Sequence, residues 1–167
     1  MINKAVQEAM NDQINKEMFS AYVYLSMSAH FAAANLPGFA HWMRAQANEE
    51  VAHAMKLFDF VHDRGGRVML KAIDGPPVEF KSALAIFESA YEHEQKVTAM
   101  INGLYEIALK EKDYPAQIML QWFISEQVEE EKNAGDIVQQ LKMVGEDGRA
   151  LLILDRELGG RAAEGEE

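Results

Sequence analysis

Apolar and polar positions divide the chain into four long segments with helical periodicity. Gly and Pro at 37–38, 65–66, 75–77, 115 and 145 separate residues 1–36, 39–64, 82–114 and 115–145. Within each segment, apolar residues recur every three or four positions, the spacing that places them on one face of an α-helix. The stripes are Ile14, Met18, Ala21, Leu25, Ser28 and Phe31; Met43, Ala47, Ala54, Leu57 and Val61; Phe87, Ala90, Val97, Ile101, Leu104 and Ala108; and Leu120, Phe123, Ala134, Ile137, Leu141 and Val144. We therefore expect four long amphipathic helices.

Residues with start and stop preferences stand at the ends of these segments. Pro37 suits the first turn of a helix, and Ser82 and Asp113 are expected N-caps. Gly65 and Gly145 are expected to end the second and fourth helices, because glycine readily adopts the left-handed conformation found there.

The lengths of the connections predict the topology. The first and third connections are short, so the first two helices and the last two should each form an antiparallel pair. About 17 residues separate the second and third helices and could span roughly 55 Å when extended. A helix of these lengths measures roughly 40 Å, so the linker can run the whole bundle. The pattern predicts an all-α, four-helix bundle with one long crossover.

The C-terminal part adds one further element. Leu151, Leu152, Ile153, Leu154 and Leu158 form a compact apolar patch that predicts a short fifth helix. We expect one domain over residues 1–160, followed by a disordered acidic tail at residues 161–167.

Polar side chains interrupt every apolar stripe near its midpoint. They are Glu17 in the first segment, Glu50 and His53 in the second, Glu94 in the third, and Gln127 and Glu130 in the fourth. Residues three apart on a helix point the same way, so each pair presents two groups to one point. Any one of these positions is usually a boundary residue with its polar end in water. Six such polar residues, all near the midpoints of their helices, instead indicate that they form one shared site.

The spacing and the charge of these residues both indicate bound cations. Glu50 follows Glu17, and Gln127 follows Glu94, by the same 33-residue interval. Four converging carboxylates would repel one another in an apolar core, and no Lys or Arg lies near them on the stripes. Protonation could neutralise some of them, whereas two divalent cations would balance all four. Carboxylates combined with imidazole suit iron or manganese.

Three sequence motifs carry a resemblance to a known family. NEEVAHAMKLFDF around Glu50 and His53, YEHE ending at Glu94, and FISEQVEEE around Gln127 and Glu130 resemble the prokaryotic non-haem ferritins. The resemblance covers essentially residues 1–160 and implies the ferritin-like fold. It also implies a di-iron centre, with Glu17, Glu50 and His53 at the first iron. Glu94, Gln127 and Glu130 would complete the second, with Glu50 bridging the two.

The same resemblance assigns roles to four neighbouring residues. Tyr24 is similar to the tyrosine that hydrogen-bonds beside this centre, although simple core packing explains it almost as well. Glu49, Glu126 and Glu129, with Glu130, resemble the third iron site of bacterial and archaeal ferritins. Acidic runs such as residues 129–131 are also common on solvated surfaces.

Composition and departures from related families exclude several alternatives. Bacterioferritins have a haem-ligating Met where Val51 stands, so we expect no haem. The absence of cysteine excludes disulfides and the cysteine-ligated iron of rubrerythrins. A net charge of −11 argues against nucleic-acid binding. No apolar run could span a membrane and no signal peptide is evident, so a cytoplasmic location is expected.

The expected function is iron storage with ferroxidase activity. Fe(II) would be oxidised by O2 or H2O2 and deposited as ferric oxyhydroxide inside a hollow homo-oligomer. The resemblance implies that this oligomer has 24 subunits. The centre would hold two iron ions per subunit, with a third site in addition. A di-iron oxidase or peroxidase acting on an organic substrate, and a metal-free helical interaction module, are the competing hypotheses.

Overall fold

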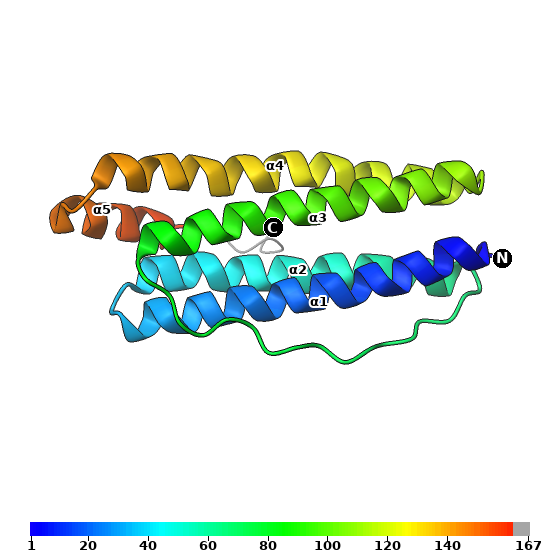
Figure 1. Ribbon diagram of the computed structural model, residues 1–167, viewed down its shortest axis with the longest axis horizontal. Coiled ribbons are helices and arrows are strands. Elements are labelled where there is room, and N and C mark those ends of the chain that lie inside the picture. Colours follow the sequence, from blue (N-terminus) through cyan, green and yellow to red (C-terminus); the bar gives the residue numbers. More distant parts are fainter. Residues whose placement is uncertain (162–167) are drawn as a thin grey trace.

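The computed structural model describes residues 1–161, and this part of the chain folds into five α-helices (Figure 1). They are α1 (Lys4–Ala33), α2 (Pro37–Asp63), α3 (Ala83–Lys110), α4 (Tyr114–Val144) and α5 (Gly148–Leu158). The predicted all-α class, the four long helices and the short fifth helix are confirmed. Six of the seven residues predicted to form the acidic tail, 162–167, lie outside the described residues.

The helix ends follow from local hydrogen bonding. Ser82 and Asp113 cap α3 and α4 as predicted, each accepting a bond from a backbone N–H in the first turn. Gly145 caps α4 as predicted, whereas the C-cap of α2 is Arg64 and Gly65 follows it. The φ angles of Gly65 and Gly145 are 69° and 55°. These left-handed conformations explain why glycine stands at both positions.

The connections produce the predicted topology. Tight turns through Asn35 and Lys112, both with positive φ, make α1–α2 and α3–α4 antiparallel pairs. Residues 64–82 cross the full length of the bundle beside α1, so that α3 runs parallel to α2 (Figure 1). Amide side chains at four-residue intervals on α1 hold this segment: Gln7 accepts from the N–H of Arg67, while Asn11 and Asn15 each bond a carbonyl and an N–H.

The apolar core is divided into two clusters. Toward the α5 end, the larger side chains are Phe31, Phe39, Trp42, Phe87 and Leu141. At the other end, Met10, Ile14, Leu57, Ile101 and Phe123 pack together. In every long helix, the polar residues predicted to form the site fall between the stretches that supply the two clusters. A buried polar layer therefore separates two apolar half-cores.

One residue of the predicted apolar stripes, Leu25, does not face the core. Leu25 is 45% exposed, whereas its neighbours Val23, Tyr24 and Met27 are buried. Because α1 packs against both α2 and α3, its buried face is wider than a single stripe and turns away from Leu25. On α5, Leu154 is buried but Leu152 and Ile153 are largely exposed. Within residues 1–161, no helix is both long and apolar enough to cross a bilayer.

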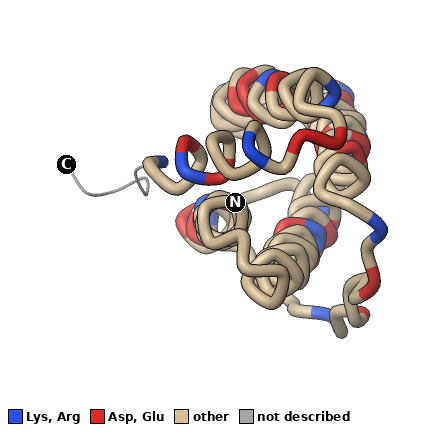
Figure 2. Tube along the Cα trace, turned by 90° about the vertical axis from the view of Figure 1, so that its left-hand side faces the viewer, with Lys and Arg blue, Asp and Glu red and all other residues tan. Residues whose placement is uncertain are grey.

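The short helix α5 packs mainly against α2, and it caps that helix. Leu36, which precedes α2, makes no capping bond with its side chain. The buried carboxylate of Asp155 on α5 instead accepts a hydrogen bond of 2.9 Å from the backbone N–H of Phe39. At the contact, a Cβ on Gly38 would lie 1.6 Å from the Asp155 carbonyl oxygen, so only glycine permits this approach. Figure 2 views the molecule from this end of the bundle.

We expect Asp155→Ala to destabilise the protein by about 1–2 kcal/mol, because it removes a helix cap and leaves a buried N–H without its partner. Urea unfolding followed by circular dichroism measures the change. Glu157→Ala, at an exposed position on the same helix, is the control and should stay within about 0.5 kcal/mol of the parent. Equal stability of the two variants would show that Asp155 does not anchor α5.

Candidate metal centre

The six site residues predicted in the long helices are all buried. Glu17 lies on α1, Glu50 and His53 on α2, Glu94 on α3, and Gln127 and Glu130 on α4. None is more than 4% exposed, although five of the six carry ionisable side chains. Such groups are seldom fully buried unless they are paired or bind a metal.

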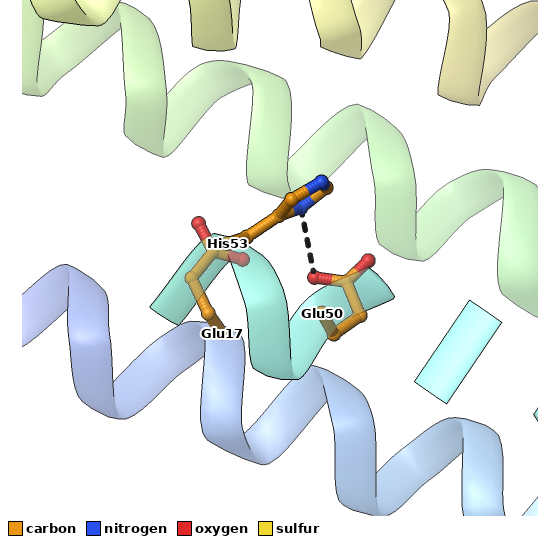
Figure 3. Close-up of side chains that lie close together, drawn as sticks. All are labelled: Glu17, Glu50 and His53. Atoms are coloured by element: carbon orange, nitrogen blue, oxygen red, sulfur yellow. Dashed lines mark ion pairs between the residues drawn. The ribbon is translucent and has the colours of Figure 1, made fainter. Parts of the chain in front are cut away.

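The α1–α2 half of the site forms a compact ligand group. One side-chain ligand atom from each of Glu17, Glu50 and His53 lies within 4.8 Å of the others. Figure 3 shows Glu17 extending from α1 toward the two side chains of α2. The His53 Nδ1 is 3.6 Å from Glu50 Oε2, and Gln13 donates a 2.9 Å bond to Glu17 Oε1. Among the described residues, the buried oxygens Glu17 Oε2 and Glu50 Oε2 have no hydrogen-bond partner.

The α3–α4 half is joined by hydrogen bonds. The Gln127 amide donates to Glu94 Oε2 at 3.2 Å, to the Glu94 carbonyl at 3.3 Å, and to Thr98. The Tyr24 hydroxyl donates to Glu94 Oε1. Tyr24 therefore contacts a site carboxylate directly, in addition to filling core space. Each carboxylate oxygen of Glu94 therefore accepts a hydrogen bond, whereas Glu17 and Glu50 in the other half each have an oxygen without a partner among the described residues.

His53 connects the two halves. Besides the group with Glu17 and Glu50, a ligand atom of His53 lies within 4.8 Å of ligand atoms of Glu126 and Glu130. The Gln46 amide donates a 2.5 Å bond to Glu130 Oε2 from the adjacent turn of α2. Two ligand groups thus share one imidazole at the centre of the bundle.

Burial dominates the ionisation of the cluster. It raises the pKa of Glu17 to about 7 and that of Glu130 to about 8, and the charge of Glu94 adds to both shifts. The pKa values of Glu50 and Glu94 are also raised, again mainly by burial. Burial lowers the pKa of His53 to about 4, with a smaller contribution from Lys56. Near neutral pH the imidazole is therefore uncharged, as a metal ligand must be.

These features fit divalent cations. Orphaned carboxylate oxygens and a neutral imidazole provide lone pairs in a buried layer where a negative charge is otherwise costly. Carboxylate oxygen with a single imidazole nitrogen is a donor set that suits iron or manganese. Cations placed among these atoms would remove both the repulsion and the unsatisfied bonding capacity.

The residues predicted for a third iron site are not arranged alike. Glu49 is buried, and both of its carboxylate oxygens accept bonds from Arg161, at 2.8 and 2.6 Å. Glu126 is half-buried and belongs to the group with His53 and Glu130. Glu129 is exposed on α4. The structure thus brings Glu126 and Glu130 together beside His53 and leaves Glu129 at the surface. Glu49 is connected to Glu130 through Arg161 and Gln46.

Sequence reasoning missed four polar residues that contact the predicted site residues: Gln13, Gln46, Thr98 and Arg161. Gln13 and Gln46 stand four residues before Glu17 and Glu50, and they share the 33-residue interval of those glutamates. That repeat was a usable signal. Arg161 carried no such signal, because it follows the last helix and reaches the site only through the docking of α5.

Comparisons with known proteins agree with the fold described above. The family model "Ferritin-like domain" matches residues 7–144. The bacterial non-heme ferritin of Bacteroides fragilis (strain 638R) is 41% identical over 161 residues, covering 96% of this chain and 100% of that protein. The bacterial non-heme ferritin of Staphylococcus haemolyticus is 40% identical, covering 97% and 98%.

Solved structures agree as well. An open pore ferritin from the hyperthermophilic archaeon Archaeoglobus fulgidus superposes with a TM-score of 0.95 at 54% identity, covering 96% of this chain and 98% of that one. A closed form of the Archaeoglobus fulgidus ferritin, engineered by site-directed mutagenesis, gives a TM-score of 0.96 at 53% identity, covering 97% and 99%.

Fold and site together define a four-helix bundle of the carboxylate–histidine class, with a buried ligand cluster at mid-height. The family match and the relatives narrow this class to one family. The chain belongs to the ferritin family, and its resemblance to the prokaryotic non-haem ferritins is confirmed.

We expect cation binding to release protons in a pH-dependent way. At pH 6, Glu17 and Glu130 lie below their raised pKa values of about 7 and about 8 and hold protons that a cation must displace. At about pH 9 or higher these two groups are largely deprotonated, so fewer protons are released. Calorimetric titration with Co(II) in buffers of different ionisation enthalpy counts them. Glu8→Gln, at an exposed position, should behave as the parent. Proton release that is independent of pH would contradict the assignment.

Proposed function

We propose that the chain is the subunit of an iron-storing ferritin that oxidises Fe(II) at the cluster described above. The observation that carries the proposal is the group formed by Glu17, Glu50 and His53, in which two buried carboxylate oxygens lack hydrogen-bond partners. In a protein of this family, a cation is the partner that such oxygens require.

The reaction takes Fe(II) and O2 as substrates. Overall, 4 Fe(II) + O2 + 4 H⁺ give 4 Fe(III) + 2 H2O, and H2O2 is a partial product or an alternative oxidant. Glu17, Glu50 and His53 hold one iron, while Glu94, Gln127 and Glu130 hold the second, with Glu50 between them. Two adjacent irons supply two electrons together and so avoid a one-electron step to superoxide. Tyr24 orients Glu94 through its hydrogen bond.

Storage requires a closed assembly, and the surface of the subunit supports one. Large apolar side chains are exposed on several helices, including Tyr22, Leu25, Ile118, Met143 and Ile153. Their exposure in a single subunit is explained if neighbouring copies cover them. By analogy with its family, we propose a hollow homo-oligomer of 24 subunits in the cytoplasm, with ferric oxyhydroxide in the cavity. Haem is not part of the proposal, because Val51 stands where the bacterioferritins place their haem ligand.

A third cation position forms part of the proposal. Glu126 and Glu130 lie together beside His53, and Glu49 is connected to Glu130 through Arg161 and Gln46. A further ion bound among these carboxylates would lie beside the pair. We retain Glu129 only as an outer carboxylate, since it is exposed. Its exposed position suits a transient ligand on the path of iron rather than a member of the buried centre.

The competing di-iron oxidase hypothesis predicts a different use of the same metals. A fixed cofactor retains about two irons per chain during turnover, whereas a storage protein takes up many more. Aerobic loading with excess Fe(II), followed by gel filtration and iron analysis of the protein peak, separates the two. A plateau at two or three irons per chain would contradict storage.

We expect Glu50→Ala to slow the initial oxidation of Fe(II) by about 10- to 100-fold, because it removes the carboxylate placed between both irons. Stopped-flow absorbance after mixing anaerobic Fe(II)-loaded protein with O2 measures the rate. Glu8→Gln, far from the cluster, should retain the parental rate, and gel filtration checks that both variants assemble. Parental oxidation by an assembled Glu50→Ala variant would exclude the proposed centre.

We expect Gln127→Glu to slow the transfer of iron out of the centre after the first turnover. A fifth carboxylate would bind the ferric ion more tightly than the neutral amide, which now bonds Glu94. The regeneration of fast Fe(II) oxidation, followed in repeated additions separated by increasing delays, reports this transfer. An unchanged regeneration time would show that Gln127 does not set the release of iron.

A further inference from the structure

Arg161 enters the centre from the end of the chain. Beyond α5, Gly159 and Gly160 turn the backbone toward α2, and the Arg161 carbonyl lies 2.8 Å from His41 Nε2. The guanidinium then lies over the Trp42 ring, with its carbon 4.8 Å from the ring centroid. These two contacts direct the side chain along α2 toward the carboxylate cluster.

The guanidinium binds one side of the cluster in a fixed geometry. Its Nη2 donates to both oxygens of Glu49, at 2.8 and 2.6 Å, and its Nη1 donates to Gln46 Oε1 at 2.8 Å. The same Gln46 passes its amide hydrogen to Glu130, 2.5 Å away. Only 22% of the Arg161 side chain is exposed. One positive charge is therefore bonded directly to Glu49 and connected through a single amide to Glu130.

We propose that Arg161 is a tethered counter-ion that occupies the third cation position and must be displaced before an iron ion can bind there. The inference rests on the third site of the proposed function. Both Glu49 oxygens are engaged by one guanidinium nitrogen, so a metal ion that uses Glu49 competes with a covalently attached cation. The two irons of the central pair do not use Glu49 and meet no such competitor.

Because Arg161 competes with cations only at the third position, the cation positions fill in a fixed order. Because Arg161 belongs to the same chain, its local concentration at Glu49 is high and does not depend on dilution. Cations therefore fill the central pair first, and the third position fills only when iron is abundant.

The test compares cation binding by Arg161→Gln and Arg156→Gln under anaerobic conditions. Arg156 is exposed on α5, so its replacement makes the same change in net charge without touching the cluster. Calorimetric titration with Co(II) counts the classes of site. We expect Arg161→Gln to tighten binding to the weaker third class of sites by about two- to fivefold, the range expected of one partly exposed ion pair. The tight pair should change less than twofold, and Arg156→Gln should match the parent.

Two further variants test whether the effect depends on the charge of Arg161 and on Glu49. Arg161→Lys retains the charge but loses the pair of hydrogen bonds to Glu49. Its affinity for Co(II) at the third class of sites should therefore lie between that of the parent and that of Arg161→Gln. Adding Glu49→Gln to Arg161→Gln should abolish the gain. Anomalous diffraction from Co(II)-soaked crystals locates the additional ion.

The titrations distinguish a failure of the proposed role of Arg161 from a failure of the proposed function. A tight pair in the parent, with a third class that is unchanged, weakened or absent in Arg161→Gln, would overturn the role of Arg161 and leave the proposed centre intact. A parent protein without a tight pair would refute the proposed function, and the role of Arg161 with it.

Discussion

The interaction on which this structure depends is the mutual repulsion of buried carboxylates that have too few partners. Glu17, Glu50, Glu94 and Glu130 lie in one layer of the bundle, and burial raises the pKa of each. Two of their oxygens are not hydrogen-bonded within the described residues. Such a layer is stable only when protons or cations neutralise it. The proposed affinity for metal therefore follows from the electrostatics of the fold.

The apolar parts of the bundle maintain this unfavourable layer. Packed clusters on both sides hold the four helices at a fixed separation, so the carboxylates cannot move apart into water. The two halves are not equivalent. The α1–α2 half has unsatisfied oxygens, while in the α3–α4 half Tyr24 and Gln127 satisfy Glu94. This asymmetry fits the proposed function, in which iron binds at the centre and then leaves it.

The C-terminal end of the chain completes the site in a way that the bundle alone does not. Asp155 anchors α5 to the first turn of α2, and this docking brings Arg161 to Glu49. One short helix thus links a structural role, the capping of α2, with an electrostatic role at the edge of the carboxylate cluster. Changes in the docking of α5 would alter both together.

The sequence by itself determined the secondary structure and most of the central ligand cluster. Periodicity, caps such as Ser82 and Asp113, and the repeated 33-residue interval are local or regular signals that survive in one dimension. Only the tertiary structure decided that Leu25 faces outward, that Glu126 joins His53, and that Arg161 pairs with Glu49. These outcomes depend on the rotation of each helix about its axis and on where α5 docks. Both are set by packing between segments far apart in the chain, and no local sequence pattern predicts that packing.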